Sequence, residues 1–449
     1  MSGPGSAGEG VTRRSFMAGA AATGVATVLS PGWSLAPLRG RVKENDADVP
    51  IAYADLALRL IIDTAGYSPP VAARAFGYFG VTMYEALVPG MKDYRSLVGD
   101  PAGLASLPHA GRAGYHWPMV ANAALASILR KLFRTAPAAD LAAIDALEQN
   151  FAAQFGRIPP GISVRSQTRG EDVARAIFEW STGDGGHEAY LRNFPSSYIV
   201  PVGEGLWVPT PPAFQPIPLQ PFWGSNRPFA ISSGAGCPAQ PPPTYSTDPS
   251  SMFYTYGREV YDTVNNLTAE QMTIASYWAD GAGTLTPPGH SISMLTQVLR
   301  YENANLERAA EAYLKVGCAV ADAFIQCWHT KYVWNLLRPV TYIRANIDGA
   351  WSSLIDTPPF PEYTSGHSTQ SGAWGATMTA LFGDAYGFTD HSHDASGFAP
   401  RSFGSFMEAA EEAMVSRLYG GIHYRFGNEA GLACGVCVGE AVAALPILD

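Results

Sequence analysis

Charged side chains are scarce in this sequence. They make up 15% of its 449 residues, and the formal net charge is −10. This composition excludes the broad basic surfaces by which proteins bind nucleic-acid phosphates. We therefore expect no nucleic-acid partner, and any site for a small anion must be assembled from particular Lys and Arg residues.

Long hydrophobic runs are also missing beyond the N-terminus, so we expect no membrane span in the mature chain. The N-terminus itself carries Arg13 and Arg14 in TRRSFM, followed by a short Ala/Gly/Val stretch. This pattern looks like a twin-arginine signal and is too short for a spanning helix. We expect residues 1–36 to be a signal peptide that ends after Ser34-Leu35-Ala36. The mature protein is then expected to be periplasmic or secreted.

Cysteine is rare and odd in number, with five in the whole chain. An odd count is a poor basis for a disulfide framework, even in an exported protein. Cys434 and Cys437 form a CxxC, but they lie in an apolar segment with helical spacing, and no second CxxC completes a zinc site. We expect both to be small buried hydrophobic residues.

Alternating β-type segments are few, and internal repeats are absent. Apolar residues recur mostly at helical spacing, which predicts an all-α helical bundle with long Pro-rich loops. We expect residues 37–449 to form a single domain, with a helical half up to about 207, a Pro-rich loop at 208–248 and a second half at 249–449 that carries the active site. Thr268 to Gln271 fits a capping box. Helices are expected near 52–65, 69–87, 117–134, 138–155, 163–181, 253–264, 269–281, 287–299, 304–333, 366–382, 402–419 and 425–444.

Two cations stand seven residues apart in WHTKYVWNLLRP. Lys331 and Arg338 would share one helix face at this spacing, and Pro339 would end the helix with Arg338 exposed at its end. Taken alone, such a pair is more typical of a solvated helix face.

The segment PFPEYTSGHS delivers Ser365, Gly366 and His367 to the start of a predicted helix. Serine is a good N-cap, glycine lets a ligand approach the backbone, and the free N–H groups of a helix start favour an anion. His367 is close enough to exchange protons with a bound group. The alternative is a capping loop that carries a surface histidine.

A third segment, SRLYGGIHYRFG, contains Arg417 and His423. Gly420 and Gly421 should end a helix just after Arg417, which frees the two side chains to converge on one centre. By itself His423 would be an ordinary loop residue. Together the three segments supply two guanidiniums, an ammonium, a hydroxyl, helix N–H groups and two histidines, which suit a tetrahedral oxyanion.

The order and spacing of these segments resemble the three-part signature of vanadium-dependent haloperoxidases and of the related type 2 phosphatidic acid phosphatases. Thr364 departs from the family pattern, which often has proline there. The stretch YWADGAGTLTPPGH, which ends at His290, also looks like the segment before the signature in bacterial haloperoxidases.

The resemblance implies that vanadate is held by Lys331, Arg338, Ser365, Gly366 and Arg417, with His423 as its axial ligand. His367 would then assist deprotonation of hydrogen peroxide, and Lys331 would polarise the peroxide. Halide attack would give a hypohalous-acid equivalent that halogenates an organic acceptor. Iodide or bromide is expected rather than chloride, because the pattern looks most like the shorter bacterial enzymes, which include iodide-preferring ones.

Two other functions remain open at this point. An exported acid phosphatase of the same superfamily would use His423 as a nucleophile, form a phosphohistidine, and place phosphate in the same cradle. A pure oxyanion-binding protein would need the cations but not the two histidines. The long chain without membrane spans favours the haloperoxidase.

Three further residues are candidates around the centre. Trp328 and Phe360 are expected to wall a halide pocket, although both would also suit core packing. Asp280 is expected to form a salt bridge with Arg417. The HSHD run at His391, His393 and Asp394 lies in a polar Gly-rich loop, and we do not expect a metal there because a metal site needs three or four placed ligands.

Overall fold

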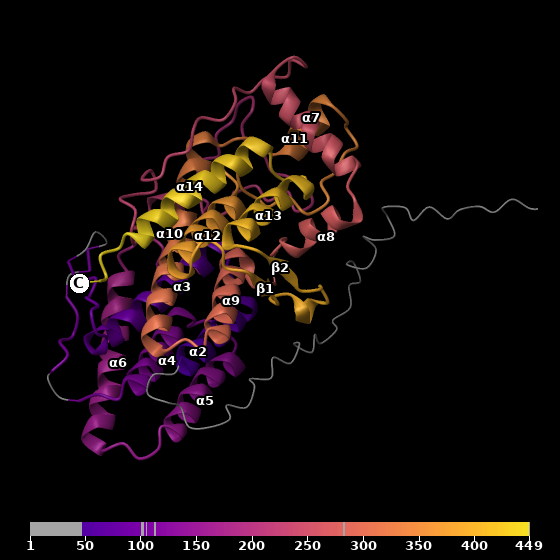
Figure 1. The fold of residues 1–449 in the computed structure, drawn as a ribbon. Coiled ribbons are helices and arrows are strands. Elements are labelled where there is room, and N and C mark those ends of the chain that lie inside the picture. Colours follow the sequence, from indigo (N-terminus) through magenta and orange to yellow (C-terminus); the bar gives the residue numbers. More distant parts are fainter. Residues whose placement is uncertain (1–46, 100–102, 105, 112–113, 282, 449) are drawn as a thin grey trace, which may run out of the picture. The chain divides into compact units, whose positions relative to one another are not determined.

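The computed structural model describes residues 47–99, 103–104, 106–111, 114–281 and 283–448 (Figure 1). The expected signal peptide and its cleavage site lie outside the described residues. All of the described residues belong to one compact unit. None of the described helices combines the length and the apolarity needed to cross a membrane.

The fold is all-α, which confirms the prediction from helical periodicity. The first half contains α2 (Asp48–Asp63), α3 (Pro69–Leu87), α4 (Trp117–Leu132), α5 (Ala138–Gln154) and α6 (Pro160–Ser181). The second half contains α7 (Met252–Asn265), α8 (Ala269–Tyr277), α9 (Thr286–Tyr301), α10 (Leu306–Trp334), α11 (Pro339–Asn346), α12 (Gly366–Phe382), α13 (Phe406–Tyr419) and α14 (Arg425–Ala443). Short 3-10 turns occur at Val88–Gly90, Ala189–Leu191, Trp223–Ser225 and Asp394–Ser396.

Several predicted bounds were wrong. Strands β1 (Phe388–Asp390) and β2 (Arg401–Phe403) pair antiparallel, so the helix expected from 402 begins only at Phe406. The capping box of Thr268 and Gln271 is confirmed at the start of α8, but this helix ends at Tyr277. Asp280 therefore lies in the following loop, with a φ of +43°.

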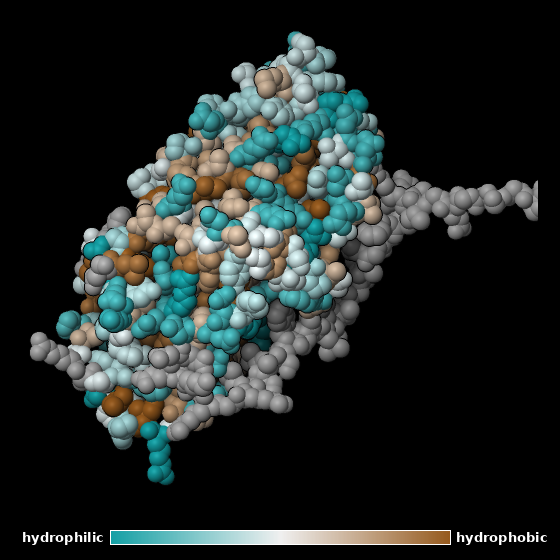
Figure 2. Space-filling view, in the orientation of Figure 1, coloured by the Kyte–Doolittle hydropathy of each residue, from teal (hydrophilic) through white to brown (hydrophobic). Residues whose placement is uncertain are grey.

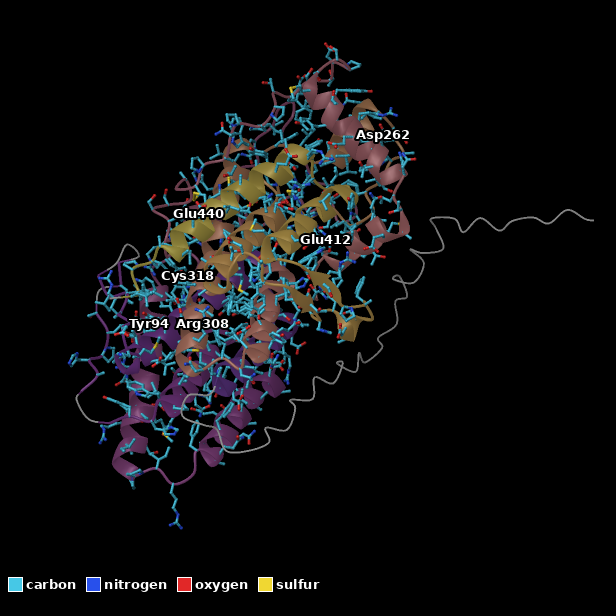
Figure 3. The ribbon with its side chains drawn as sticks, in the orientation of Figure 1. Tyr94, Asp262, Arg308, Cys318, Glu412 and Glu440 are labelled. Atoms are coloured by element: carbon cyan, nitrogen blue, oxygen red, sulfur yellow. A yellow bond between two sulfur atoms is a disulfide. The ribbon has the colours of Figure 1, made fainter. Side chains whose placement is uncertain are left out.

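Helix α10 joins the two halves, because it packs against α3 and α2 on the N-terminal side and against α12, α14 and α9 on the other. Tyr94, in a loop of the first half, donates a hydrogen bond of 3.0 Å to Glu311 Oε2 on this helix, and Arg308 of the same helix donates another of 3.0 Å to that oxygen; both residues are labelled in Figure 3. Helix α10 therefore connects both halves of the molecule.

The end of α10 corrects the interpretation of Lys331 and Arg338. Asn335 adopts a left-handed conformation with a φ of +45° and closes the helix after Trp334. Asn tolerates this conformation better than most residues. Arg338 instead caps α11 and is 0% exposed, so the two cations do not share a helix face and Arg338 is not exposed.

Helices α12 and α14 lie unusually close to each other. Gly431, Gly435 and Gly439 repeat every four residues along α14, and a Cβ added to Gly435 would lie 2.0 Å from the carbonyl oxygen of Thr369 on α12. The backbones can approach this closely only because the side chains are absent. This contact fixes the start of α12, which carries the Ser-Gly-His segment.

A disulfide corrects the cysteine prediction. Cys237, in the Pro-rich loop, is bonded to Cys437 on α14, at a sequence separation of 200. Cys434 is buried and free, as expected.

The Pro-rich loop is also held by Asp322 of α10, whose carboxylate accepts three backbone hydrogen bonds from residues 229–231. On the face shown in Figure 2, hydrophilic and hydrophobic residues are interspersed.

Candidate active site

The start of α12 is built as the sequence predicts. Ser365 is the N-cap, and its Oγ accepts a 3.4 Å hydrogen bond from the backbone N–H of Ser368. A Cβ added to Gly366 would touch only the ring of Trp328, at 3.6 Å, so the glycine leaves open space beside the helix start. The segment thus offers free backbone donors next to a gap of atomic size.

Lys331 is fully buried at the end of α10. Its Nζ donates to the carbonyl oxygens of Pro361 at 2.9 Å, Glu362 at 2.9 Å and Thr364 at 2.5 Å. Burial lowers the pKa of Lys331 to about 7. The ammonium therefore holds the segment that leads into α12, and an anion beside it would have to take over one of these three N–H groups.

Arg338 reaches the same region from the start of α11. Its Nε donates to Phe360 O at 2.8 Å, and its Nη1 donates to Ile422 O at 2.9 Å. Its Nη2 is buried and has no hydrogen-bond partner among the described residues. Burial lowers the pKa of Arg338 to about 10, so the side chain remains charged at neutral pH with one donor free.

Arg417 comes from the last turn of α13, which ends just before Gly420 and Gly421 as predicted. Its Nε donates to Ser416 Oγ at 2.9 Å, and its Nη2 donates to Ala275 O at 3.2 Å. Burial lowers its pKa to about 10, so Arg417 is also charged at neutral pH.

His423 is buried between a cation and a carboxylate. Its Nε2 lies 3.1 Å from Arg338 Nη1, and its Nδ1 lies 2.7 Å from Glu362 Oε1. A guanidinium can only donate, so Nε2 must be the acceptor and the proton must be on Nδ1, where Glu362 accepts it. Burial, with the nearby cations, lowers the pKa of His423 well below its ordinary value, so the ring is neutral with a lone pair on Nε2.

Glu362 is the residue that the sequence analysis missed. It is 0% exposed, and Gly427 makes room for it, since a Cβ there would lie 2.3 Å from Oε1. Burial raises the pKa of Glu362 to about 7, and Lys331 and Arg338 oppose that rise. The sequence did contain a signal for Glu362, because it is the acidic residue of the PFPEYTSGHS segment, which was predicted to lie among cations.

His367 follows Gly366 and lines the same space. Burial lowers the pKa of His367 well below its ordinary value, and the charge of Arg417 adds to this effect. Its Nε2 is buried and has no partner among the described residues. A neutral imidazole with a free nitrogen is suited to accept a proton from a bound molecule.

A cavity of about 480 Å³ opens beside these groups, and Gly366, His367, Arg417 and His423 line it. Trp328 and Phe360 line it as well, with ring centroids 5.0 Å apart. Lys331 Nζ lies 5.0 Å from the centroid of the Phe360 ring, and the guanidinium carbon of Arg338 lies 4.8 Å from it. The two aromatic rings therefore form an apolar wall directly beside the cations.

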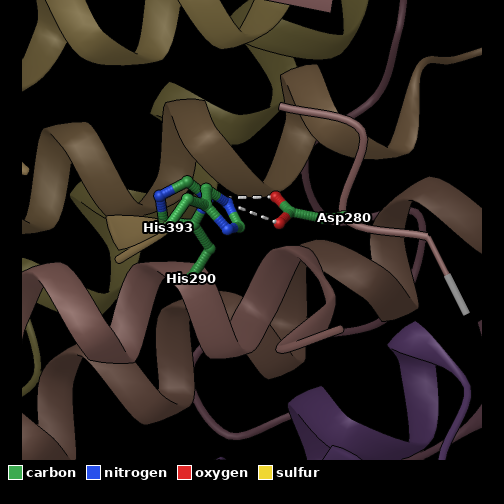
Figure 4. A group of neighbouring side chains, drawn as sticks. All are labelled: Asp280, His290 and His393. Carbon is green, nitrogen blue, oxygen red and sulfur yellow. Dashed lines mark hydrogen bonds and ion pairs between the residues drawn. The ribbon is translucent and has the colours of Figure 1, made fainter. Parts of the chain in front are cut away.

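Asp280 does not form the salt bridge with Arg417 that the sequence suggested. It pairs instead with two histidines: Asp280 Oδ2 lies 3.0 Å from His290 Nδ1, and Oδ1 lies 3.1 Å from His393 Nε2 (Figure 4). The loop position of Asp280 after α8 turns the carboxylate toward α9. Arg417 receives only the longer-range attraction of this carboxylate, which raises its pKa slightly against the effect of burial.

The HSHD run is divided between this cluster and the surface. His393 joins Asp280 and His290, and the three side chains come close enough for one metal ion. His391, by contrast, is exposed, and its Nδ1 lies 2.8 Å from Asp394 Oδ2. Both nitrogens of His290 are already bonded, because Nε2 lies 2.7 Å from Asp390 Oδ2. Burial disfavours its charge, but the two carboxylates outweigh burial and raise the pKa of His290 to about 10, so the cluster holds a buried imidazolium.

Comparison with known proteins shows the family of the chain. The family model for the VCPO second helical-bundle domain matches residues 311–446. A solved bacterial vanadium-dependent iodoperoxidase is 34% identical, with a TM-score of 0.82, over 92% of this chain and 99% of that one. The chain belongs to the bacterial vanadium-dependent haloperoxidases.

More distant structures share the fold of this haloperoxidase. The apo and holo forms of a bacterial vanadium-dependent chloroperoxidase are 14% and 16% identical, with TM-scores of 0.64 and 0.63. Each match covers 85% of this chain and 94% of the other. No curated protein sequence matches the chain significantly.

Proposed function

We propose that this haloperoxidase binds vanadate in the buried cationic cradle and uses hydrogen peroxide to oxidise iodide or bromide in preference to chloride. The observation that carries the proposal is a pair of buried nitrogen atoms without partners, one a donor on Arg338 and the other a proton acceptor on His367. Arg338 Nη2 and His367 Nε2 both lack hydrogen bonds among the described residues, and both belong to the same cluster as the helix start at Gly366.

The donor set fits a tetrahedral oxyanion. Lys331, Arg338 and Arg417 bring positive charge, and each is no more than 1% exposed. Ser365 and the backbone of Gly366 add neutral donors at a helix start, where the dipole favours an anion. Buried cations of this kind are costly without a counter-charge, so a bound oxyanion would relieve the cost.

The two histidines divide the remaining tasks. The Nε2 lone pair of His423 would ligate the central atom, and Glu362 keeps the proton on Nδ1 so that this lone pair is available. Bound vanadate would supply a Lewis-acidic centre that activates hydrogen peroxide for two-electron transfer to the halide. His367 would accept the peroxide proton, and Lys331 would stabilise the negative charge that develops on the oxygen atoms.

The halide preference is argued from the wall of the cavity. Trp328 and Phe360 present apolar ring surface next to Lys331 and Arg338. A large, weakly hydrated iodide loses less on leaving water for such a wall than a small, strongly hydrated chloride does. The 34% identity to an iodoperoxidase supports the same direction.

A paired assay on one purified sample tests the proposal. Orthovanadate should activate the oxidation of iodide and bromide by hydrogen peroxide, and the rate should fall from iodide to chloride. The same sample should hydrolyse p-nitrophenyl phosphate poorly. Brisk phosphatase turnover without halide oxidation after vanadate loading would favour the phosphatase alternative, in which His423 is a nucleophile.

We also propose that the protein is exported through the signal that contains Arg13 and Arg14. The disulfide between Cys237 and Cys437 supports an oxidising compartment. Replacing both arginines by lysine should leave the protein unprocessed in the cytoplasm, as measured by cell fractionation. A processed, exported double variant would contradict this route.

A further inference from the structure

A second cluster of titratable side chains lies outside the cradle. Asp280 comes from the loop after α8, His290 from α9, and His393 from the loop between β1 and β2 (Figure 4). Each of the three residues is no more than 7% exposed. Their nitrogen and oxygen atoms lie within 4.8 Å of one another. Three segments that are distant in sequence thus bring two imidazoles and a carboxylate to one buried point.

The distances within this cluster suit a shared metal ion. His290 Nδ1 lies 3.0 Å from Asp280 Oδ2, and His393 Nε2 lies 3.1 Å from Asp280 Oδ1. An ion bonded to nitrogen and oxygen at about 2.0–2.2 Å holds its ligand atoms about 3.3–3.5 Å apart in a tetrahedron. Both distances to the carboxylate are therefore within about 0.5 Å of the spacing that such an ion imposes.

Two buried atoms of the cluster have no hydrogen-bond partner among the described residues, namely Asp280 Oδ1 and His393 Nε2. They lie 3.1 Å apart, so their distance allows a hydrogen bond and only the orientation of the two groups prevents it. Leaving both atoms unsatisfied inside the protein is costly. A cation bound to both atoms would remove this cost, because each atom would then be one of its ligands.

The other ring nitrogen of His290 is held in the way that metal-binding histidines usually are. His290 Nε2 lies 2.7 Å from Asp390 Oδ2. The carboxylate of Asp390 is itself fixed, because it accepts hydrogen bonds of 2.6 Å from the hydroxyls of Tyr277 and Ser392. A carboxylate that accepts the N–H of one ring nitrogen fixes the tautomer and makes the other nitrogen a better metal ligand. Asp390 therefore orients His290 with Nδ1 toward the ion.

The charges of the cluster favour a divalent cation. Asp280 and Asp390 are buried carboxylates on either side of His290, and the imidazolium of His290 in the metal-free protein offsets only one of them. A divalent ion offsets both carboxylates, and the Nδ1 proton of His290 is released to solvent as the ion binds. Asp280 also lines the cavity beside the cradle, so an ion can reach the cluster from that side.

We propose that Asp280, His290 and His393 bind one divalent transition-metal ion such as Zn²⁺. Imidazole nitrogens favour this class of ion over Mg²⁺ and Ca²⁺, which prefer oxygen ligands. The bound ion cross-links the loop after α8, helix α9 and the loop between β1 and β2, and it thereby stabilises one wall of the cavity. The proposal does not depend on the haloperoxidase function, because none of the three ligands belongs to the cradle.

Metal titration of the chelator-treated full chain tests this proposal. Calorimetry with Zn²⁺ should show one site per chain, and Zn²⁺ should raise Tm by several degrees, whereas Mg²⁺ at the same concentration should leave Tm unchanged. Co²⁺ should give the intense visible absorption of a four-coordinate site, with water as the fourth ligand. Absence of binding heat, of the Tm increase and of the Co²⁺ absorption would overturn the proposal.

Variants connect these readouts to the cluster. His393→Gln removes a ligand and should weaken Zn²⁺ binding at least a hundredfold, and Asp390→Asn, which keeps all three ligands, should weaken it by about ten- to a hundredfold. His391→Ala is the matched control, because His391 lies in the same loop but is exposed and faces Asp394, so Zn²⁺ affinity should stay within twofold.

The site of binding decides the outcome of these variants. Zn²⁺ binding that survives His393→Gln unchanged, or that is lost in His391→Ala, would place the ion elsewhere and overturn the proposal. The Co²⁺ spectrum of the unaltered chain needs no substitution, which keeps the proposal testable should His393→Gln fold poorly.

Discussion

Replacing Glu362 by glutamine tests the central electrostatic argument of the site. The glutamate accepts the Nδ1 proton of His423 at 2.7 Å and a backbone hydrogen bond from Tyr424 at 3.2 Å. Glutamine preserves the shape but removes the charge, and its amide nitrogen can face Nδ1 as a donor. The ring of His423 would then be drawn toward the tautomer whose Nε2 carries the proton and cannot ligate vanadium.

The expected magnitude follows from the kind of bond that is lost. A hydrogen bond to a charged group contributes about 1.5–3 kcal/mol to stability, and a neutral one about 1 kcal/mol. Loss of a carboxylate that orients a metal-ligating histidine typically costs about ten- to a hundredfold in affinity, or roughly 1.4–2.7 kcal/mol. Burial already raises the pKa of Glu362 to about 7, so removing the charge also relieves a desolvation cost. We therefore expect vanadate affinity to fall by this factor while Tm changes little.

The assay is a vanadate titration of the apo protein, followed by calorimetry, with Tm and circular dichroism recorded on the same samples. Glu259→Gln is the matched control, because Glu259 forms a partly exposed ion pair with Arg425 and lies outside the cradle. An unchanged vanadate Kd in folded Glu362→Gln protein would refute the assignment of the His423 tautomer.

The remaining predictions concern the proposed vanadate ligand His423, the disulfide of Cys437 and the buried imidazolium of His290. His423→Ala should abolish vanadate binding and halide oxidation, whereas His391→Ala, at an exposed position, should change neither; turnover by His423→Ala would place the centre elsewhere. Cys437→Ser should lower the free energy of unfolding by about 2–5 kcal/mol, measured by urea denaturation, because it opens a cross-link that spans 200 residues. The pKa of His290 is raised to about 10, so its charge stabilises the fold fully below pH 6.5 and less as the pH rises toward 10. The difference in unfolding free energy between wild type and His290→Gln should therefore be largest near pH 6 and shrink by pH 10, and a difference independent of pH would contradict the charged state.

The sequence was sufficient for the helical architecture and for the local position of several candidate cradle residues. Helical periodicity is a local property, and most helix bounds could be read from it within a few residues. Ser365 and Arg417 could also be placed, because a cap and a glycine-terminated helix depend on neighbours in the chain. The interpretation of Arg338 failed where one backbone conformation decided the outcome, since the left-handed Asn335 ends α10 before the arginine.

Pairings between distant residues could not be predicted in the same way. Cys237 meets Cys437 across 200 residues, and Asp280 meets His393 from a different loop. Nothing in either local sequence distinguishes these partners from other candidates, because the contact exists only after the helices have packed. Asp280 was selected as a candidate from the sequence, but Arg417 was wrongly predicted as its partner for this reason.

The donors of the site were therefore easier to predict than the groups that make those donors tolerable. Lys331, Arg338 and Arg417 stand in recognisable positions, yet three cations that are at most 1% exposed would be strongly destabilising without compensation. The chain supplies that compensation through three carbonyl oxygens that accept hydrogen bonds from Lys331, and through the carboxylate of Glu362, which fits into the space beside Gly427. Three atoms of the site remain without partners among the described residues, namely Arg338 Nη2, His367 Nε2 and Glu362 Oε2. A single oxyanion beside the helix start at Gly366 could accept a hydrogen bond from Arg338 Nη2 and lie next to His367 Nε2, so the position of these two atoms supports the site independently of the motif.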